Sequence, residues 1–492
     1  MKSIKDYQFW FVTGSQFLYG DEALQQVAEN AETLVSSWNS SGGLPAKLVL
    51  KDVVTSSQVF DEIVRQANYD ESCAGIIVWC HTFSPSKMWI NGLNQLNKPY
   101  AHLHTQLNRN IPNEGIDMDY MNLHQAAHAD REHAFIAARM RIPRTLIVGY
   151  WEDEQVIRQI DDWMRVAATV QLSRRMRVVR FGDNMRDVAV TEGDKVQTQI
   201  DLGWQVNTWA VGDLVQVINE VTDTEIDEQI AIYKERYDVA TEQLDSVRYQ
   251  ARAEIAMKRM LDEEGAGAFT NTFEDLWGME ELPGLASQHL MDLGYGYAGE
   301  GDWKTSAMTH LIMCMGEGRP GGTSFMEDYT YDLTPGHELA LGAHMLEVSP
   351  RLAAERPKIE VHPLGIGSRS DPARLVFEGK EGPAILVSLI NMGNRLRLIV
   401  HDIDVVKPTL EMPNLPVARV MWKPAPNLYT GTKCWMLAGG AHHATLTQQV
   451  SWQQMRDFAE YFDLEFVHIH ADSDPDRLQQ ELKLADLAWK IR

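Results

Sequence analysis

Four short segments of the 492-residue chain carry side chains that bind divalent metals, each beside glycine or a short turn. They hold Glu300 in AGEGDW, Glu327 in GGTSFMEDYTY, His344 in LGAHMLEV, and His442 with His443 in LAGGAHHATL. Because the segments are far apart along the chain, they form no compact motif such as HExxH, and the fold must assemble any site. Two carboxylates with two imidazoles suit Mn²⁺, and also Mg²⁺, Co²⁺ or Fe²⁺, better than the thiolate sets of structural zinc. Open coordination positions would then take substrate oxygens.

Glu300 is the most informative of these residues because it lies between Gly299 and Gly301. A surface glutamate needs no glycine beside it, whereas a carboxylate that a metal or ligand approaches closely needs slender backbone with φ freedom. The competing interpretation is ordinary structure, since a single histidine is more often a core hydrogen-bonding residue and Glu327 beside Asp328 could be a surface pair. The shared glycine context favours a site.

The elements that would position these residues fall into three parts, which we predict as domains at 1–172, 173–320 and 321–492. The first two have the rhythm of βαβ units, which predicts α/β domains with parallel sheets. In the third, short alternating runs such as ARLVFEG, PAILVSLINM and RLRLIVHDIDVV are separated by Gly, Pro and Asn turns. This pattern predicts an antiparallel sheet or barrel, followed by a helix near 451–462.

In the first domain, parallel strands would end at two candidate ligand loops, 14–20 and 80–89. Neither loop contains GxGxxG or a Walker A sequence, so a nucleotide has no motif support. A helix from about Met121 would place His124 and His128 one turn apart on one face. Hydrogen-bonded helix histidines are the competing interpretation of that pair.

Charge and composition exclude several classes of function. Lys and Arg total 45 against 69 Asp and Glu, a formal net charge of −24 that disfavours nucleic acid and anionic membranes as partners. No apolar run approaches the roughly 18 residues of a membrane span, and the N-terminus lacks a signal-peptide pattern. The four cysteines have no ligand spacing. We therefore expect a cytoplasmic enzyme without disulfides.

Longer phrases of the sequence resemble one known family from end to end. They include WFVTGSQFLYG, VWCHTFSPSKMWINGL, MDYMNLHQAAH, GYGYAGEGDWKTSA, GGTSFMEDYTY, HMLEVSP and AGGAHH, and the family they resemble is L-arabinose isomerase. The resemblance implies two Rossmann-like domains followed by a C-terminal β-barrel domain. It also implies an aldose-ketose isomerase that interconverts L-arabinose and L-ribulose, and more weakly D-galactose and D-tagatose.

The same resemblance implies roles for individual residues. Glu300, Glu327, His344 and His443 would hold the metal, usually Mn²⁺ and otherwise Co²⁺ or Mg²⁺, and the two glutamates would be catalytic. The sugar would be lined by Gln16, Leu18, Tyr19, Phe83, Gln125, His128, Met185, Phe273 and Asp302. Family members are hexamers or tetramers in which residues such as Phe83 and His128 reach a neighbour's site. His124 departs from the family pattern, where Asn is more usual.

Chemistry explains why such an enzyme would need these residue types. Moving hydrogen from C2 to C1 of an aldose requires stabilisation of an enediolate, which a divalent cation provides, and paired carboxylates for proton transfer. A metal-assisted hydride shift is the rival route. Two other functions stay open from the residues alone, a metal-dependent hydrolase and a non-catalytic sugar-binding protein.

Overall fold

The computed structural model describes residues 3–491, and the chain separates between Leu172 and Ser173 into two compact units. Both units contain parallel sheets with helices, so the fold is mixed α/β as predicted. No helix within residues 3–491 is long and apolar enough to cross a membrane.

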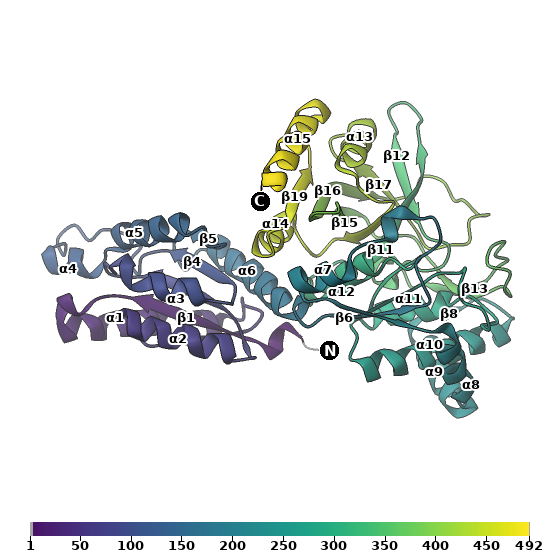
Figure 1. Cartoon of the computed structure of the whole chain (residues 1–492), viewed down its shortest axis with the longest axis horizontal. Helices are drawn as coiled ribbons and strands as arrows, with labels where there is room; N and C mark the ends of the chain where they lie inside the picture. The colour runs from purple at the N-terminus through teal and green to yellow at the C-terminus, as the bar shows by residue number, and fades with distance from the viewer. Residues whose placement is uncertain (1–2, 492) are drawn as a thin grey trace. The chain divides into compact units, whose positions relative to one another are not determined.

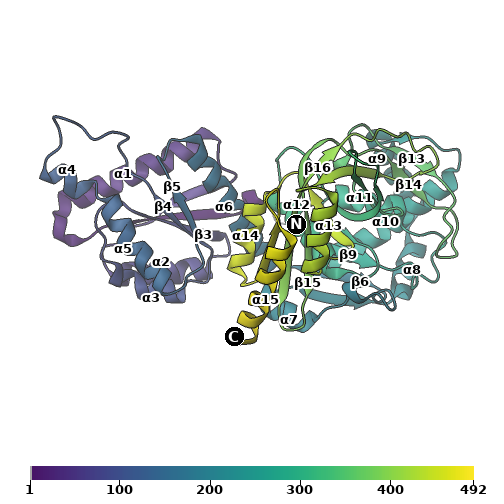
Figure 2. The same ribbon diagram turned by 90° about the horizontal axis from the view of Figure 1, so that it is seen from above.

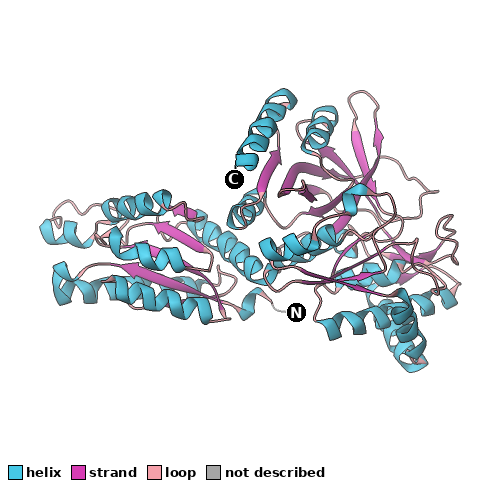
Figure 3. Ribbon diagram, in the orientation of Figure 1, coloured by secondary structure: helices cyan, strands magenta, loops and turns pink. Residues whose placement is uncertain are grey.

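The first unit is a five-stranded parallel sheet with helices on both faces (Figure 1, Figure 3), in the strand order β2-β1-β3-β4-β5. The strands are β1 (Gln8–Gly14), β2 (Lys47–Leu50), β3 (Cys73–Cys80), β4 (Tyr100–His104) and β5 (Thr145–Val148). The helices are α1 (Gly20–Ser41), α2 (Ser57–Tyr69), α3 (Ile90–Gln95), α4 (Met118–Leu123), α5 (Ala126–Arg139) and α6 (Glu154–Ser173).

The apolar strands of this unit are explained by burial on both faces of the sheet. Phe9 and Phe11 of β1 pack in one core with Trp38 of α1, and the Phe11 and Trp38 ring centroids are 5.8 Å apart. Alternate residues of the same strand, Trp10 among them, lie in the opposite core with Phe60 of α2. A parallel strand covered on both sides reads as a continuous apolar run, which is why the sequence pattern identified these strands.

The second unit begins with a four-stranded parallel sheet in the order β10-β9-β6-β7. Its strands are β6 (Arg177–Phe181), β7 (Gln205–Trp209), β9 (Ala268–Asn271) and β10 (Gly296–Ala298). Its helices are α7 (Lys195–Leu202), α8 (Val211–Glu220), α9 (Asp223–Arg236), α10 (Leu244–Glu264), α11 (Gly284–Asp292) and α12 (Trp303–Met315). Glu300 therefore lies in the turn between β10 and α12.

The remainder of the unit is a seven-stranded sheet and a small three-stranded sheet. The large sheet contains β11 (Thr323–Asp332), β12 (Leu339–Ala343), β15 (Gly382–Asn391), β16 (Leu396–Val406), β17 (Arg419–Pro424), β18 (His443–Thr447) and β19 (Glu465–Ile469). The small one contains β8 (Asp238–Val239), β13 (Lys358–Val361) and β14 (Ala373–Val376). The helices here are α13 (Leu428–Ala438), α14 (Trp452–Tyr461) and α15 (Pro475–Ile491), which lie near one another in Figure 2. Helices α13 and α14 pack against β16 and β19.

Six strands of the large sheet pair antiparallel in a closed ring, in the order β15-β18-β11-β12-β17-β16 and back to β15. The seventh strand, β19, pairs parallel with β16. The sheet is therefore mixed, whereas the sequence predicted an antiparallel sheet or barrel. The helix α14 connects β18 to β19, and such a crossover returns a strand in the direction of the one it left. Because β18 and β16 are both antiparallel to β15, β19 is parallel to its neighbour β16.

One apolar core joins the parallel sheet of the second unit to the ring of strands. Phe325 of β11 meets Tyr297 of β10 edge to face, with ring centroids 5.9 Å apart, and both lie in a single buried cluster. This packing fixes β11 beside the end of β10.

The domain boundary expected near residue 320 stays a prediction. Cys73, Cys80, Cys314 and Cys434 are free thiols.

Candidate metal centre

Strand register in the ring places two of the predicted ligands side by side and a third one residue further along the chain. Glu327 of β11 pairs directly with His443, the first residue of β18, and on its other side with Ala343 of β12. His344 immediately follows Ala343. Directly paired residues point to the same face of a sheet, so Glu327 and His443 face the same way. Glu300 then approaches from the turn after β10.

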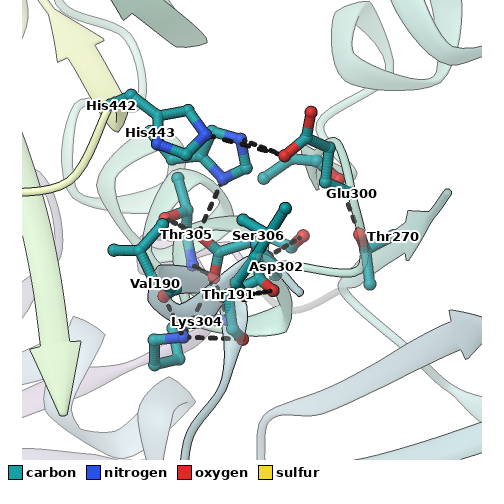
Figure 4. A network of polar contacts seen from close by, with 12 residues as sticks. Val190, Thr191, Thr270, Glu300, Asp302, Lys304, Thr305, Ser306, His442 and His443 are labelled. Carbon is teal, nitrogen blue, oxygen red and sulfur yellow. Dashed lines mark hydrogen bonds and ion pairs between the residues drawn. The ribbon is translucent and has the colours of Figure 1, made fainter. Parts of the chain in front are cut away.

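The resulting distances are short enough for four side chains to share one ion. His443 Nε2 lies 3.1 Å from Glu327 Oε1 and 3.5 Å from Glu300 Oε2. His442 Nε2 lies 3.6 Å from the same Glu300 oxygen (Figure 4). Ligand atoms of Glu300, Glu327, His442 and His443 all fall within 4.8 Å of one another. His344 is outside this compact group, but its Nε2 lies 3.4 Å from Glu327 Oε1.

Two further carboxylates fix the tautomers of the imidazoles. His443 Nδ1 lies 3.0 Å from Asp302 Oδ2, and His344 Nδ1 makes a short contact with Glu347 Oε2. A carboxylate only accepts hydrogen bonds, so each Nδ1 carries a proton, and in the neutral imidazole each Nε2 then presents a lone pair to the cluster. This carboxylate–imidazole arrangement is the usual support of a metal-bound histidine.

The cluster contains polar atoms that the protein itself does not satisfy. Neither His443 Nε2 nor Glu327 Oε1 has a hydrogen-bond partner within residues 3–491, although both are buried. At 3.1 Å these two atoms need positive charge between them, either a proton on His443 Nε2 or a bound cation. The residues present therefore fit a divalent metal with oxygen and nitrogen ligands.

The pKa values of the carboxylates and imidazoles are shifted by the opposite charges that face them. His442 and then His443 hold the pKa of Glu300 well below its usual range. Burial alone would raise the pKa of Asp302, but the Lys304 ammonium and His443 lower it. For His443, burial would lower the pKa, but the surrounding carboxylates, Asp302 first, raise it well above the ordinary value. The pocket therefore stabilises positive charge.

The glycines beside Glu300 serve contacts within the protein. Glu300 itself has φ of 60°, in the left-handed region that costs a non-glycine residue on the order of 1 kcal/mol and is frequent at functional sites. A Cβ on Gly301, with φ of 77°, would lie 2.5 Å from the Asn184 backbone, and one on Gly299 would lie 3.0 Å from the His344 ring. The glycines thus let the turn approach its neighbours closely, whereas the sequence predicted that they make room for a ligand.

Three of the other predicted residues lie around this cluster. The Met185 amide donates to the Glu300 carbonyl at 2.9 Å. Phe273 lines a cavity together with Glu300 and His344. Asp302 is 1% exposed, and it accepts hydrogen bonds from the Thr305 hydroxyl and from backbone amides as well as from His443. Its oxygens are therefore occupied by protein donors, one of which is His443, and its predicted contact with the sugar stays a prediction.

The remaining six predicted sugar residues lie in the first unit, on loops after β1 and β3 and near the start of α5. Tyr19 OH accepts a hydrogen bond from Gln125 Nε2 at 3.1 Å. The rings of Phe83 and His128 are 4.8 Å apart. Gln16 precedes the short turn of Phe17–Tyr19, and Leu18 in that turn is 83% exposed. Within their own unit these side chains form two contacting pairs beside an exposed apolar turn.

The single helix expected from about Met121 is wrong. Helix α4 ends at Leu123, and α5 begins at Ala126. The Gln125 amide donates to the carbonyl of His81, which interrupts the helical hydrogen bonds. His124 instead packs its ring 4.3 Å from that of Tyr120, so His124 and His128 do not share one helical face.

Comparison with known proteins identifies the chain. Models described as the N-terminal, central and C-terminal domains of L-arabinose isomerase match residues 3–175, 177–318 and 322–465. The chain belongs to the L-arabinose isomerase family. Proteins of that name from Thermotoga petrophila and Thermotoga maritima are 52% identical over 100% of this chain and 99% of their own. The one from Geobacillus kaustophilus is 52% identical over 100% of both.

A solved structure titled as a periplasmic sugar-binding protein of an ABC sugar transporter from Legionella pneumophila also aligns, at 12% identity over 62% of this chain and 94% of its own. Its TM-score of 0.15 is too low to carry an argument. As a member of the L-arabinose isomerase family the chain is an enzyme, an aldose-ketose isomerase.

Sequence reasoning assigned no role to two residues of this family member's site. The resemblance selected only His443 of the adjacent pair, yet the imidazole of His442 also joins the compact group. Glu347 was not singled out, although it follows His344 by three residues in HMLEV. An acidic residue a short step from a candidate ligand histidine is the signal that could have found it.

Proposed function

We propose that this enzyme interconverts L-arabinose and L-ribulose, with weaker action on D-galactose and D-tagatose, and that it depends on a divalent metal. Family membership supports the reaction class. The observation that carries the metal is the pair of buried, unpartnered atoms, His443 Nε2 and Glu327 Oε1, which face each other 3.1 Å apart. Mn²⁺ is the cation we propose, with Co²⁺ or Mg²⁺ as alternatives.

Glu300, Glu327 and His443 would hold the ion, with His344 as the proposed fourth ligand and His442 as the imidazole nearest to Glu300. When bound, the ion would act as a Lewis acid toward neighbouring oxygens of the open-chain sugar. The rest of the chemistry belongs to side chains of this protein.

Glu300 and Glu327 are the proposed carriers of the transferred protons. One carboxylate takes the proton from C2 and returns it to C1, and the other moves the hydroxyl proton from O2 to O1. The depressed pKa of Glu300 keeps it ionised at neutral pH, as a base must be. Glu327 is also held below its usual pKa, since His344 and His443 outweigh the effect of burial. Both groups therefore start in the basic form.

Asp302 and Glu347 act behind the ligands. By accepting a hydrogen bond from Nδ1 they hold His443 and His344 with Nε2 toward the cluster.

We further propose that the enzyme is a homo-oligomer, a hexamer or tetramer, in which the six sugar residues of the first unit complete a neighbouring chain's site. The exposed Leu18 and the paired Phe83 and His128 support this assignment.

One experiment tests the function, the metal and the hydrogen path together. Chelated protein and protein reloaded with Mn²⁺ are incubated with a panel of aldoses in deuterated water, and products are identified by NMR. We expect ketose only from the reloaded protein, with deuterium at C1. Full turnover after chelation would contradict the metal, and retention of protium at C1 would favour a hydride shift.

Adding a sugar ester and a glycoside to the panel separates the two other candidates, since free aldoses offer a hydrolase no bond to cleave. A hydrolase would cleave a bond of a sugar derivative with uptake of water, and a sugar-binding protein would bind without forming product. Neither outcome would be compatible with the proposed isomerase.

A further inference from the structure

Lys304 occupies a position that helix chemistry and burial both disfavour. It is the second residue of α12, directly behind the N-cap Asp302, and it is 1% exposed. The first turn of a helix carries partial positive charge, so a cation there is unfavourable. Removing an ammonium from water adds a further cost unless the group is fully paired. A residue that breaks two local rules in one place is typical of a functional site.

The ammonium is satisfied by an unusual set of partners. Lys304 Nζ donates to the carbonyl oxygens of Val190 at 3.1 Å, Thr191 at 2.9 Å and Glu192 at 2.8 Å (Figure 4). It also lies 3.4 Å from Asp302 Oδ1. Three donors thus bind three consecutive carbonyls, and the charge rests against a carboxylate.

These contacts join two structures that meet at the metal cluster. The carbonyls belong to the segment after β6, whose Asn184 Nδ2 donates to Thr191 O at 2.7 Å and whose Met185 amide donates to the Glu300 carbonyl. The carboxylate is the one that holds His443. A single side chain therefore connects the backbone of one ligand with the support of another.

Backbone packing at the same place leaves little freedom. A Cβ on Gly193 would lie 2.9 Å from the Trp303 ring and 3.3 Å from Lys304 Cδ. The segment around Val190–Gly193 therefore lies directly on the first turn of α12, where it covers the lysine from solvent. If Lys304 only held the two segments together, its hydrogen bonds would suffice and its charge beside Asp302 would not be needed. A substitution that removes the charge therefore separates a structural role from a role at the metal site.

We propose that Lys304 is a positioning residue of the metal site, which fixes residues 183–192 on α12 and orients His443 through Asp302. This inference rests on the proposed metal-dependent function. It predicts that loss of the ammonium weakens metal binding and loosens the Met185 segment together, even where the fold survives.

The test compares Lys304→Met with Lys98→Met. Lys98 is a matched control because it is also buried and its Nζ donates to a backbone carbonyl, that of Asp70, at 3.1 Å within the first unit. Both variants should lower the melting temperature. Only Lys304→Met should raise the Kd for Mn²⁺ by about 10- to 100-fold, the range for loss of a group that supports a metal ligand, in calorimetric titrations of metal-free protein.

Hydrogen exchange of the metal-free proteins gives a second readout. The Met185 amide should exchange faster in Lys304→Met than in the wild type, and no faster in Lys98→Met. If Lys304→Met does not fold, Lys304→Gln serves, since its amide donates two hydrogen bonds but carries no charge, and we expect at least about a 10-fold rise in Kd.

Wild-type affinity for Mn²⁺ in a destabilised but folded Lys304 variant, with unchanged protection of Met185, would overturn the proposal and leave a structural staple. If the wild type itself binds no Mn²⁺, the proposed function fails. The exchange of Met185 still reports on Lys304 in that case.

Discussion

The strongest prediction concerns two amide substitutions that look equivalent in sequence but differ in the hydrogen bonds they leave. Asp302 and Glu347 each hold the Nδ1 of one histidine. In Asp302→Asn, one oxygen must still accept the backbone amides of Lys304 and Thr305 that cap α12. The new NH₂ group therefore takes the place of Oδ2 and faces His443 Nδ1.

That orientation forces His443 into the other tautomer. Its Nδ1 must accept the hydrogen bond, so Nε2 acquires the proton and faces Glu327 Oε1, 3.1 Å away. The cluster then loses one ligand and gains a hydrogen bond where the ion should lie. Loss of a supporting partner costs 10- to 100-fold in metal affinity, and this case belongs at or beyond the upper limit, about 2.7 kcal/mol.

Glu347→Gln has a milder solution. Its amide oxygen can keep the His344 Nδ1 and Leu346 amide donors, while its NH₂ group donates to Tyr297 OH, which lies 3.1 Å from Glu347 Oε1. The Tyr297 hydroxyl can turn toward Asn271 Oδ1, 3.5 Å away. His344 keeps its tautomer and only the charge is lost, so we expect about a 10-fold loss of affinity, near 1.4 kcal/mol.

The assay is calorimetric titration of both metal-free variants with Mn²⁺ at constant pH, alongside circular dichroism to establish the fold. The ratio between the two Kd values is the decisive quantity, because general destabilisation would affect both. Equal losses, or a larger loss in Glu347→Gln, would refute the tautomer argument.

Three other predictions follow from the structure. Burial raises the pKa of Glu281 to about 7, so this group stabilises the fold below its unfolded pKa of 4.5 and loses that contribution as pH rises through 7. In Glu281→Gln the amide oxygen can accept the Ser246 and Gln250 donors. This variant should therefore have a higher melting temperature than wild type at pH 8 and no higher one at pH 5. Glu300→Gln and Glu327→Gln should each lower kcat by about 10²- to 10⁴-fold with an unchanged circular dichroism spectrum, and a smaller loss in either would remove it from proton transfer. If the first unit serves a neighbour's site, mixtures of inactive His128→Ala and inactive Glu327→Ala chains, refolded together, should recover activity; mixtures that stay inactive would place both residues in one chain's site.

The sequence predicted the parallel sheets because burial on both faces imposes a local pattern. The apolar runs YQFWFVTG, AKLVLKDVV, KPYAHLHT and PRTLIVGYW contain β1, β2, β4 and β5, and AGIIVWCHT contains all of β3 except its first residue, Cys73. The break before α5 was not predictable in the same way, because it depends on a hydrogen bond between Gln125 and His81. Local periodicity carries no record of such a contact.

The metal centre shows the same division between local pattern and register. The glycines beside Glu300 indicated that residue as a candidate, but the pairing of Glu327 with His443 depends on the register between β11 and β18. A shift of one residue would turn either side chain to the other face. Whether His344 or His442 joins the compact group depends on distances between side-chain atoms, which residue spacing in the sequence does not encode. Resemblance to the family therefore supplied ligand assignments that the residues alone left open.

Charge explains why this arrangement calls for a cation. Glu300 and Glu327 are the carboxylates of the cluster, while Asp302 contacts Nδ1 of His443 and Glu347 contacts Nδ1 of His344. All four carboxylates are largely removed from solvent. Like charges gathered in a low-dielectric site are unfavourable unless compensated. Lys304 offsets one carboxylate from behind, and its position against the helix dipole shows how strongly the site favours positive charge. A divalent ion held by Glu300 and Glu327, as we propose, would neutralise the two carboxylates of the cluster itself.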